Sequence, residues 1–122
     1  MQARYKGRVE FLAVYIREAH PTDGWRMETN DRVGIKFRQP LTNAERESVA
    51  MECCSAMKIK MPMVVDDIND RVGHLYSGMP DRLYVIDRRS RVTYKSGRGP
   101  RGFKPAEIEQ SLILLLMDQA AP

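Results

Sequence analysis

The chain has 122 residues, 43% of them hydrophobic and 30% charged, which is enough apolar material for one domain with a single core. Its net charge of +4 is too small by itself to indicate a nucleic-acid-binding protein, and its two adjacent cysteines, Cys53 and Cys54, exclude the disulfide framework of a small secreted protein. No apolar run is long enough to cross a bilayer and none follows Met1, so a soluble, cytoplasmic protein is expected.

The first third of the chain predicts one strand followed by a long loop. Residues 1–7 are polar and basic and are typical of the last turn of a helix, with Gly7 just beyond its end. Residues 9–16 are apolar, β-branched and aromatic without alternation, which predicts a short strand buried on both faces. Residues 18–40 carry two prolines and two glycines and predict a functional loop, within which residues 32–37 suit a short edge strand.

A helix, a strand and a short helix are expected next. Thr42 is a good N-cap with Glu45 three residues later, which is a capping box, and the helix should run to about Lys58. Its buried face is expected to contain Val49, Ala50, Cys53, Cys54 and Met57. Residues 61–65 predict a second buried strand and residues 68–76 a short helix. The aspartates at 66, 67 and 70 lack the spacing of an EF-hand, and no His/Cys cluster has zinc spacing, so no metal site is predicted.

The last third predicts a hairpin and a covering helix. Residues 83–86 and 91–95 are two strands joined by a four-residue turn, and residues 96–104 form a glycine-rich basic loop. Pro105 at the first helical position begins a final helix that should end near Gln119. A parallel strand pair followed by an antiparallel hairpin and a helix is the order of the distal part of a thioredoxin-like α/β fold. We therefore treat residues 1–122 as one domain with an active-site loop insertion at 18–40.

Three stretches of the chain closely resemble the iodothyronine deiodinase family. They are residues 15–25 (YIREAHPTDGW), residues 81–86 (DRLYVI) and residues 97–100 (GRGP). The resemblance implies a thioredoxin-like fold, a central mixed sheet flanked by helices, that lacks its first β-α unit. It also implies reductive dehalogenation of iodinated aromatic substrates such as iodothyronines, or a related thiol- or selenol-based reduction. No bound cofactor is implied; a thiol reductant, delivered by a partner protein, would be the electron donor.

The nucleophile of that family is a selenocysteine or cysteine at the start of the helix before the strand at 9–16. The resemblance therefore implies that the nucleophile lies upstream of Met1 and that the isolated chain is inactive. Two alternatives stay open from the residues. One is a catalytically dead thioredoxin-like module that binds an anionic aromatic ligand or a protein partner, and the other is a basic surface binder centred on residues 88–104. No nucleic-acid or membrane partner is expected, and a homodimer is compatible with the unpaired strand edge.

By position, the resemblance assigns a substrate clamp to His20, Asp81 and Arg98, with His20 also relaying the proton. Asp81 replaces a glutamate of the family, and Pro40 replaces a histidine. Without the resemblance, we would interpret His20 and Arg98 as ordinary turn residues. Glu18 either orients His20 or is a solvated acid.

Trp25 either stacks on an aromatic substrate or anchors its loop to the core. The thioredoxin-like layout implies that the Met79-Pro80 bond is cis and that Pro80 lies near the site. Cys53 and Cys54 are interpreted first as small apolar helix residues and second as a resolving thiol, because neither is at a predicted helix start. The charge run at 88–104 is more often a solvated hairpin face than a nucleic-acid patch.

Overall fold

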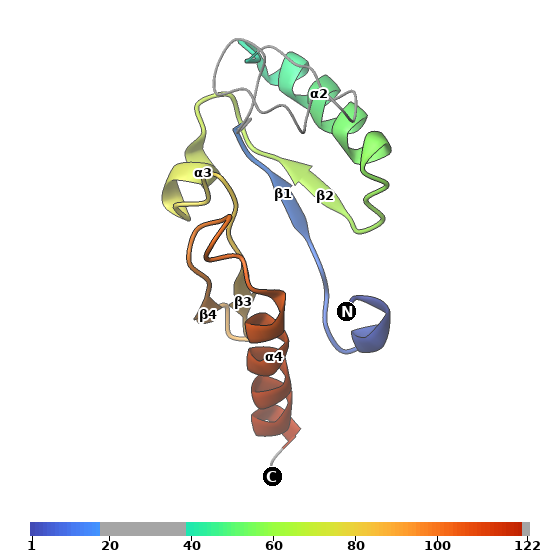
Figure 1. The fold of residues 1–122 in the computed structure, drawn as a ribbon, viewed down its shortest axis with the longest axis vertical. Helices are drawn as coiled ribbons and strands as arrows, with labels where there is room; N and C mark the ends of the chain where they lie inside the picture. Colours follow the sequence, from blue (N-terminus) through green and yellow to red (C-terminus); the bar gives the residue numbers. More distant parts are fainter. Residues whose placement is uncertain (18–38, 121–122) are drawn as a thin grey trace. The chain divides into compact units, whose positions relative to one another are not determined.

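The computed structural model describes residues 1–17 and 39–120. The chain divides into two compact units, Gln2–Ser77 and Gly78–Pro122, with Met1 grouped with the second (Figure 1). The elements follow the predicted order of strand, helix, strand, short helix, two strands and helix. Within the described residues, no helix is both long and apolar enough to span a membrane.

The first unit contains a two-stranded parallel sheet. A short 3-10 helix, η1 (Ala3–Tyr5), precedes β1 (Ala13–Tyr15), and β1 pairs with β2 (Met63–Val65) with Val14 opposite Val64. Gly7 has a φ of +80°, the left-handed conformation expected just after a helical turn, so this part of the prediction is confirmed. Both strands are shorter than their apolar runs.

The prediction that these strands are buried on both faces is wrong. Val14 is 41% exposed, Val64 48% and Leu12 59%. Burial alternates along each strand, because α2 packs against β2 and one helix covers only one face of a two-stranded sheet. The strand sequences do not alternate between apolar and polar residues because both faces of the sheet are apolar. Within the described part of this unit, one of these faces is exposed.

Helix α2 (Asn43–Ala56) begins as predicted, and its predicted inner face is confirmed at Val49, Ala50, Cys53 and Cys54, which are buried or half-buried, with the unpredicted Arg46 added to it. The Oγ1 atom of Thr42 accepts a hydrogen bond from the Glu45 N–H at 3.1 Å, and Glu45 Oε2 accepts from the Leu41 N–H at 2.7 Å, one residue before the usual capping-box donor. Arg46 and Ala50 are each 1% exposed. Met57, predicted to be buried, is 62% exposed because it lies beyond the helix end.

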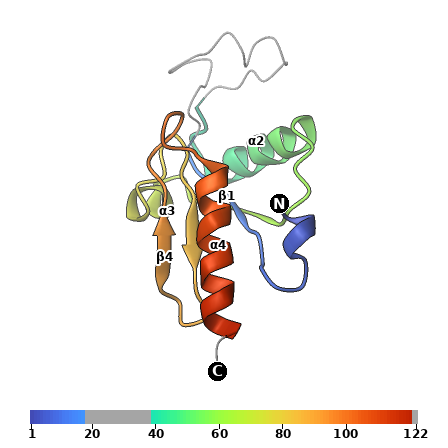
Figure 2. The same ribbon diagram turned by 60° about the horizontal axis from the view of Figure 1, so that its bottom comes forward.

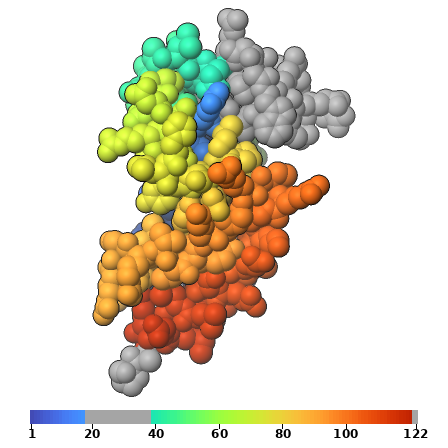
Figure 3. Space-filling view, turned by 90° about the vertical axis from the view of Figure 1, so that its left-hand side faces the viewer, coloured from blue at the N-terminus to red at the C-terminus, as the bar shows by residue number. Residues whose placement is uncertain are grey.

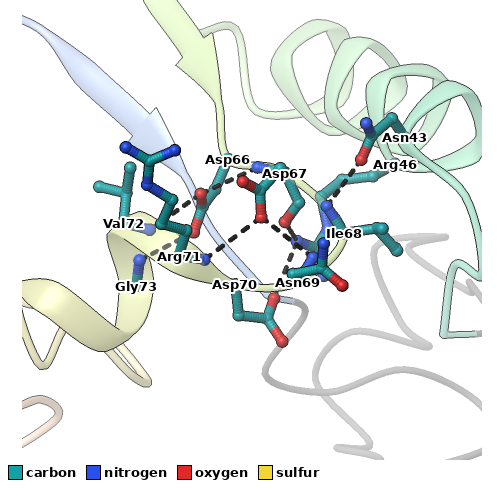
Figure 4. A network of polar contacts seen from close by, with 10 residues as sticks. All are labelled: Asn43, Arg46, Asp66, Asp67, Ile68, Asn69, Asp70, Arg71, Val72 and Gly73. Carbon is teal, nitrogen blue, oxygen red and sulfur yellow. Dashed lines mark hydrogen bonds and ion pairs between the residues drawn. The ribbon is translucent and has the colours of Figure 1, made fainter.

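A polar network joins α2 to the connection between β2 and α3 (Arg71–Leu75), as Figure 4 shows. The Asp66 carboxylate, 5% exposed, accepts from the N–H groups of Asp67 (2.8 Å), Val72 (3.0 Å) and Gly73 (2.8 Å). Burial raises the pKa of Asp66, but these hydrogen bonds and the nearby Arg46 charge outweigh it, so the pKa lies below its ordinary value.

Arg46 connects α2 to this network by its guanidinium group. Its Nη1 atom donates to the Asp67 carbonyl and lies 2.8 Å from Asp70 Oδ1. The Asn43 side chain accepts from the Ile68 N–H at 2.7 Å. The charged side chain of Arg46 is therefore buried because its partners lie on the loop that follows β2, a pairing that helical periodicity cannot predict.

The second unit is a hairpin covered by a helix. Strands β3 (Tyr84–Ile86) and β4 (Val92–Lys95) pair antiparallel, and α4 (Pro105–Ala120) packs against both (Figure 2). Val85 and Leu112, each 5% exposed, belong to the core. The Asp87 carboxylate closes the turn by accepting from the N–H groups of Arg89 (2.8 Å) and Arg91 (3.0 Å). The predicted hairpin and final helix are confirmed.

The architecture is a small mixed α/β arrangement with two short sheets, each within one unit. A single central mixed sheet stays a proposal, as does the assignment of residues 1–122 to one domain. The edge strand predicted at 32–37 lies outside the described residues, as does most of the predicted 18–40 loop.

Candidate functional site

Asp81 and Arg98 lie in one unit, at the open end of the β3–β4 hairpin. The Gly99 N–H donates to the Asp81 carbonyl at 3.0 Å, so the residue after Arg98 pairs directly with Asp81. Both side chains are exposed. Among the ion pairs that join described residues, none links this carboxylate to this guanidinium. The backbone of Asp81 is therefore paired with the residue next to Arg98, and both charged side chains are exposed.

The strand ladder extends past β3 and β4 to reach this position. The Ser96 N–H donates to the Leu83 carbonyl at 2.9 Å, and the Leu83 N–H donates to Ser96 Oγ at 2.9 Å rather than to the Ser96 carbonyl. That carbonyl instead accepts from Arg82 Nε at 2.7 Å. The hairpin backbone therefore places the segment 81–83 against the segment 96–99.

Glycines allow the loop at 97–102 to close on itself. A Cβ at Gly102 would lie 2.3 Å from the Gly97 carbonyl carbon and 2.6 Å from the Arg98 carbonyl oxygen. A Cβ at Gly99 would lie 1.8 Å from Asp81 Oδ1, so the carboxylate lies directly against the Gly99 backbone. The loop containing these residues, coloured orange, lies on the molecular surface in Figure 3. No side chain is tolerated at these two positions without a shift of the neighbouring atoms.

Only part of the predicted site falls within the described residues. Glu18, His20 and Trp25 lie outside them, so their roles stay predictions. The Met79-Pro80 bond is cis, as predicted, and Gly99-Pro100 is also cis, which the sequence analysis did not anticipate. The position of Pro80 relative to His20 is untested.

The two cysteines lie in the last turn of α2 and are half-buried. Cys54 Sγ donates a weak hydrogen bond to the Ile59 carbonyl at 3.5 Å. Free carbonyls, rather than free N–H groups, face outward at this end of a helix. The location agrees with the interpretation of both residues as small helix side chains, and the resolving-thiol hypothesis stays untested.

Sequence reasoning missed Ser96, which is 2% exposed and joins the two segments of the site. Its position between a strand and a glycine-rich loop suggests an ordinary turn serine. The only available signal was its register opposite Leu83, which requires the strand pairing to be known first.

Comparisons with known proteins match nearly the whole chain. The family model described as iodothyronine deiodinase matches residues 1–114. A thyroxine 5-deiodinase of Gallus gallus is 35% identical over 81% of this chain and 36% of its own length. A thyroxine 5-deiodinase of Sparus aurata is 32% identical over 90% of this chain and 39% of its own length.

A type I iodothyronine deiodinase of Xenopus laevis is 30% identical over 81% of this chain and 37% of its own length. The chain belongs to the iodothyronine deiodinase family. It spans little more than a third of these relatives. The resemblance found at residues 15–25, 81–86 and 97–100 is therefore confirmed at the level of the family.

Asp81 and Arg98 carry opposite charges on exposed side chains. Arg98 presents donors in a planar fork that suits a carboxylate or a phenolate, and Asp81 accepts from an ammonium or a hydroxyl. Both groups lie on backbone that the hairpin fixes. The described residues contain no group of three or more His, Cys, Asp or Glu side chains able to bind a metal ion.

Proposed function

We propose that this chain forms the substrate-binding part of an enzyme that reductively removes iodine from iodinated aromatic compounds such as iodothyronines. The observation that carries the proposal is the pairing of Asp81 with the Arg98 loop in a chain of the deiodinase family. The names of its relatives, thyroxine 5-deiodinase and type I iodothyronine deiodinase, support the substrate class.

A thioredoxin-like arrangement of the two units belongs to the same proposal. The parallel pair β1–β2 and the antiparallel pair β3–β4 have the order and directions that this fold requires. The family resemblance assigns His20, Asp81 and Arg98 together to one substrate clamp. His20 then contributes the third contact of the clamp.

The reaction requires a nucleophile that these 122 residues do not present at a helix start. Both cysteines of the sequence lie at the far end of α2. In the proposed reaction, a thiolate or selenolate forms a bond to iodine as the carbon–iodine bond breaks, and the ring carbon gains a proton through His20. A thiol reductant then supplies two electrons, which releases iodide and restores the nucleophile.

The experiment measures thyroxine binding by calorimetry with the unsubstituted chain, Arg98→Ala and Asp81→Asn. Loss of a charged contact should weaken binding by about 1.5–3 kcal/mol, or roughly tenfold to a hundredfold. Arg88→Ala is the matched control, since Arg88 is an exposed arginine at the opposite end of the same hairpin. Equal binding by Arg98→Ala and Arg88→Ala contradicts the proposed site.

A second candidate is a binding module without catalytic activity, favoured by the position of the cysteines. This candidate predicts the same dependence of thyroxine binding on Arg98. It differs in turnover, because joining this chain to a nucleophile-bearing segment from one of the deiodinase relatives would produce no iodide release. Iodide release in dithiothreitol by such a chimaera, with loss in Arg98→Ala, supports the enzyme and contradicts the binding module.

A further inference from the structure

Ser96 lies at the base of the loop that carries Arg98, with its side chain inside the protein. It is 2% exposed, and its hydroxyl group is used in both directions. The Oγ atom accepts from the Leu83 N–H at 2.9 Å and donates to the Gly97 carbonyl at 2.8 Å. One hydroxyl group thus connects the segment before β3 to the first residue of the loop.

Three hydrogen bonds hold the backbone around Arg98, one from a side chain and two from backbone groups. The Gly97 carbonyl accepts from Ser96 Oγ at 2.8 Å, and the Gly99 N–H donates to the Asp81 carbonyl at 3.0 Å. The Arg98 carbonyl accepts from the Gly102 N–H at 2.8 Å. Because the contacts lie before, at and after Arg98, its backbone is held while its side chain stays exposed.

We propose that Ser96 is a positioning residue for Arg98: it holds the backbone of the Arg98 loop against the segment that carries Asp81 before a ligand binds. The inference rests on the proposed function and extends it to a residue that makes no ligand contact itself. If the loop is already ordered before the ligand binds, binding loses less conformational entropy, and the affinity is higher. Of the three contacts around Arg98, the Ser96 contact is the one made by a side chain, so substitution can remove it alone.

The chain offers a matched control within the same hairpin. Thr93 Oγ1 donates to the Val85 carbonyl at 3.3 Å, so it also joins β3 to β4 through a hydroxyl, away from the loop. Ser96→Ala leaves the Leu83 N–H and the Gly97 carbonyl without their partner. Ser96→Thr keeps the hydroxyl group and should therefore keep the loop ordered. Thr93→Val removes the control hydroxyl group with little change in side-chain shape.

The first measurement needs no ligand. Hydrogen exchange by NMR should show the Gly99 and Gly102 amides exchanging about tenfold faster in Ser96→Ala, the factor expected for loss of one net hydrogen bond. Ser96→Thr should restore slow exchange, and Thr93→Val should leave both amides unchanged. Unchanged exchange at Gly99 and Gly102 in Ser96→Ala overturns the proposal, as does an equal increase in Thr93→Val.

The second measurement tests coupling to Arg98 with thyroxine as the probe. Ser96→Ala should weaken binding by about threefold to tenfold in the unsubstituted background and have no effect in the Arg98→Ala background. Equal weakening in both backgrounds overturns a role through Arg98. No thyroxine binding by the unsubstituted chain refutes the proposed function instead, and the exchange rates then still decide whether Ser96 holds the loop.

Discussion

Substitution of Gly102 by alanine should destabilise the protein strongly, for a purely steric reason. The added Cβ would lie 2.3 Å from the Gly97 carbonyl carbon, 2.5 Å from its Cα and 2.6 Å from the Arg98 carbonyl oxygen. All three are backbone atoms, which no rotamer change can move. Gly99→Ala is the informative comparison, because the three atoms nearest to its Cβ all belong to the Asp81 side chain, which is exposed and can rotate away.

The expected magnitude follows from opposing effects. Forced overpacking costs about 1–3 kcal/mol. Displacing Gly102 also breaks its 2.8 Å hydrogen bond to the Arg98 carbonyl, which contributes about 1 kcal/mol. The lower entropy of an unfolded alanine offsets about 0.4–1 kcal/mol. The net loss for Gly102→Ala is about 1–3.5 kcal/mol, whereas Gly99→Ala should change the free energy of unfolding by less than about 1 kcal/mol.

Urea unfolding followed by circular dichroism measures both values from the midpoints at constant m. Gly99→Ala should keep near-normal stability and lose thyroxine affinity, because Asp81 is displaced. Comparable stability of the two variants would refute the steric argument and the loop geometry on which the site depends.

Three other outcomes are expected. Arg46→Met should lower the free energy of unfolding by about 3 kcal/mol, because the partners of this guanidinium, which is 1% exposed, lose their contact. Arg71→Met, at an exposed position, should change the free energy of unfolding by less than about 0.5 kcal/mol. Equal effects of the two substitutions in urea unfolding would contradict the role of Arg46 in the polar network. Because the pKa of Asp66 is lowered on folding, the unfolded chain binds more protons, so the stability should fall as the pH drops below 3.8, the ordinary pKa of an aspartate. Asp66→Asn should flatten this dependence of stability on pH, and an unchanged slope in acid unfolding would rule the argument out. The 122-residue chain with dithiothreitol should release no iodide from thyroxine, and release abolished by Cys53→Ser or Cys54→Ser would show that the chemistry has been misplaced.

The sequence by itself determined the order and type of the elements. Thr42 with Glu45 predicts the start of α2, and Pro105 predicts the start of α4, because caps and proline act through local backbone groups. The motifs at residues 15–25, 81–86 and 97–100 also identified the family that the comparisons show. Each of these signals is local, so no tertiary contact was needed to interpret it.

Tertiary structure decided which side chains are buried and which residues of the site meet. Arg46 is buried because a loop 21 residues away supplies a carbonyl partner, while Val14 and Val64 stay exposed on an open sheet face. Ser96 reaches Leu83 only through the register of β3 and β4, which no spacing in the sequence reveals. Burial and strand register depend on which distant segments pair. The free energy of such pairing comes from contacts between residues that are far apart in the sequence, so local patterns do not reveal it.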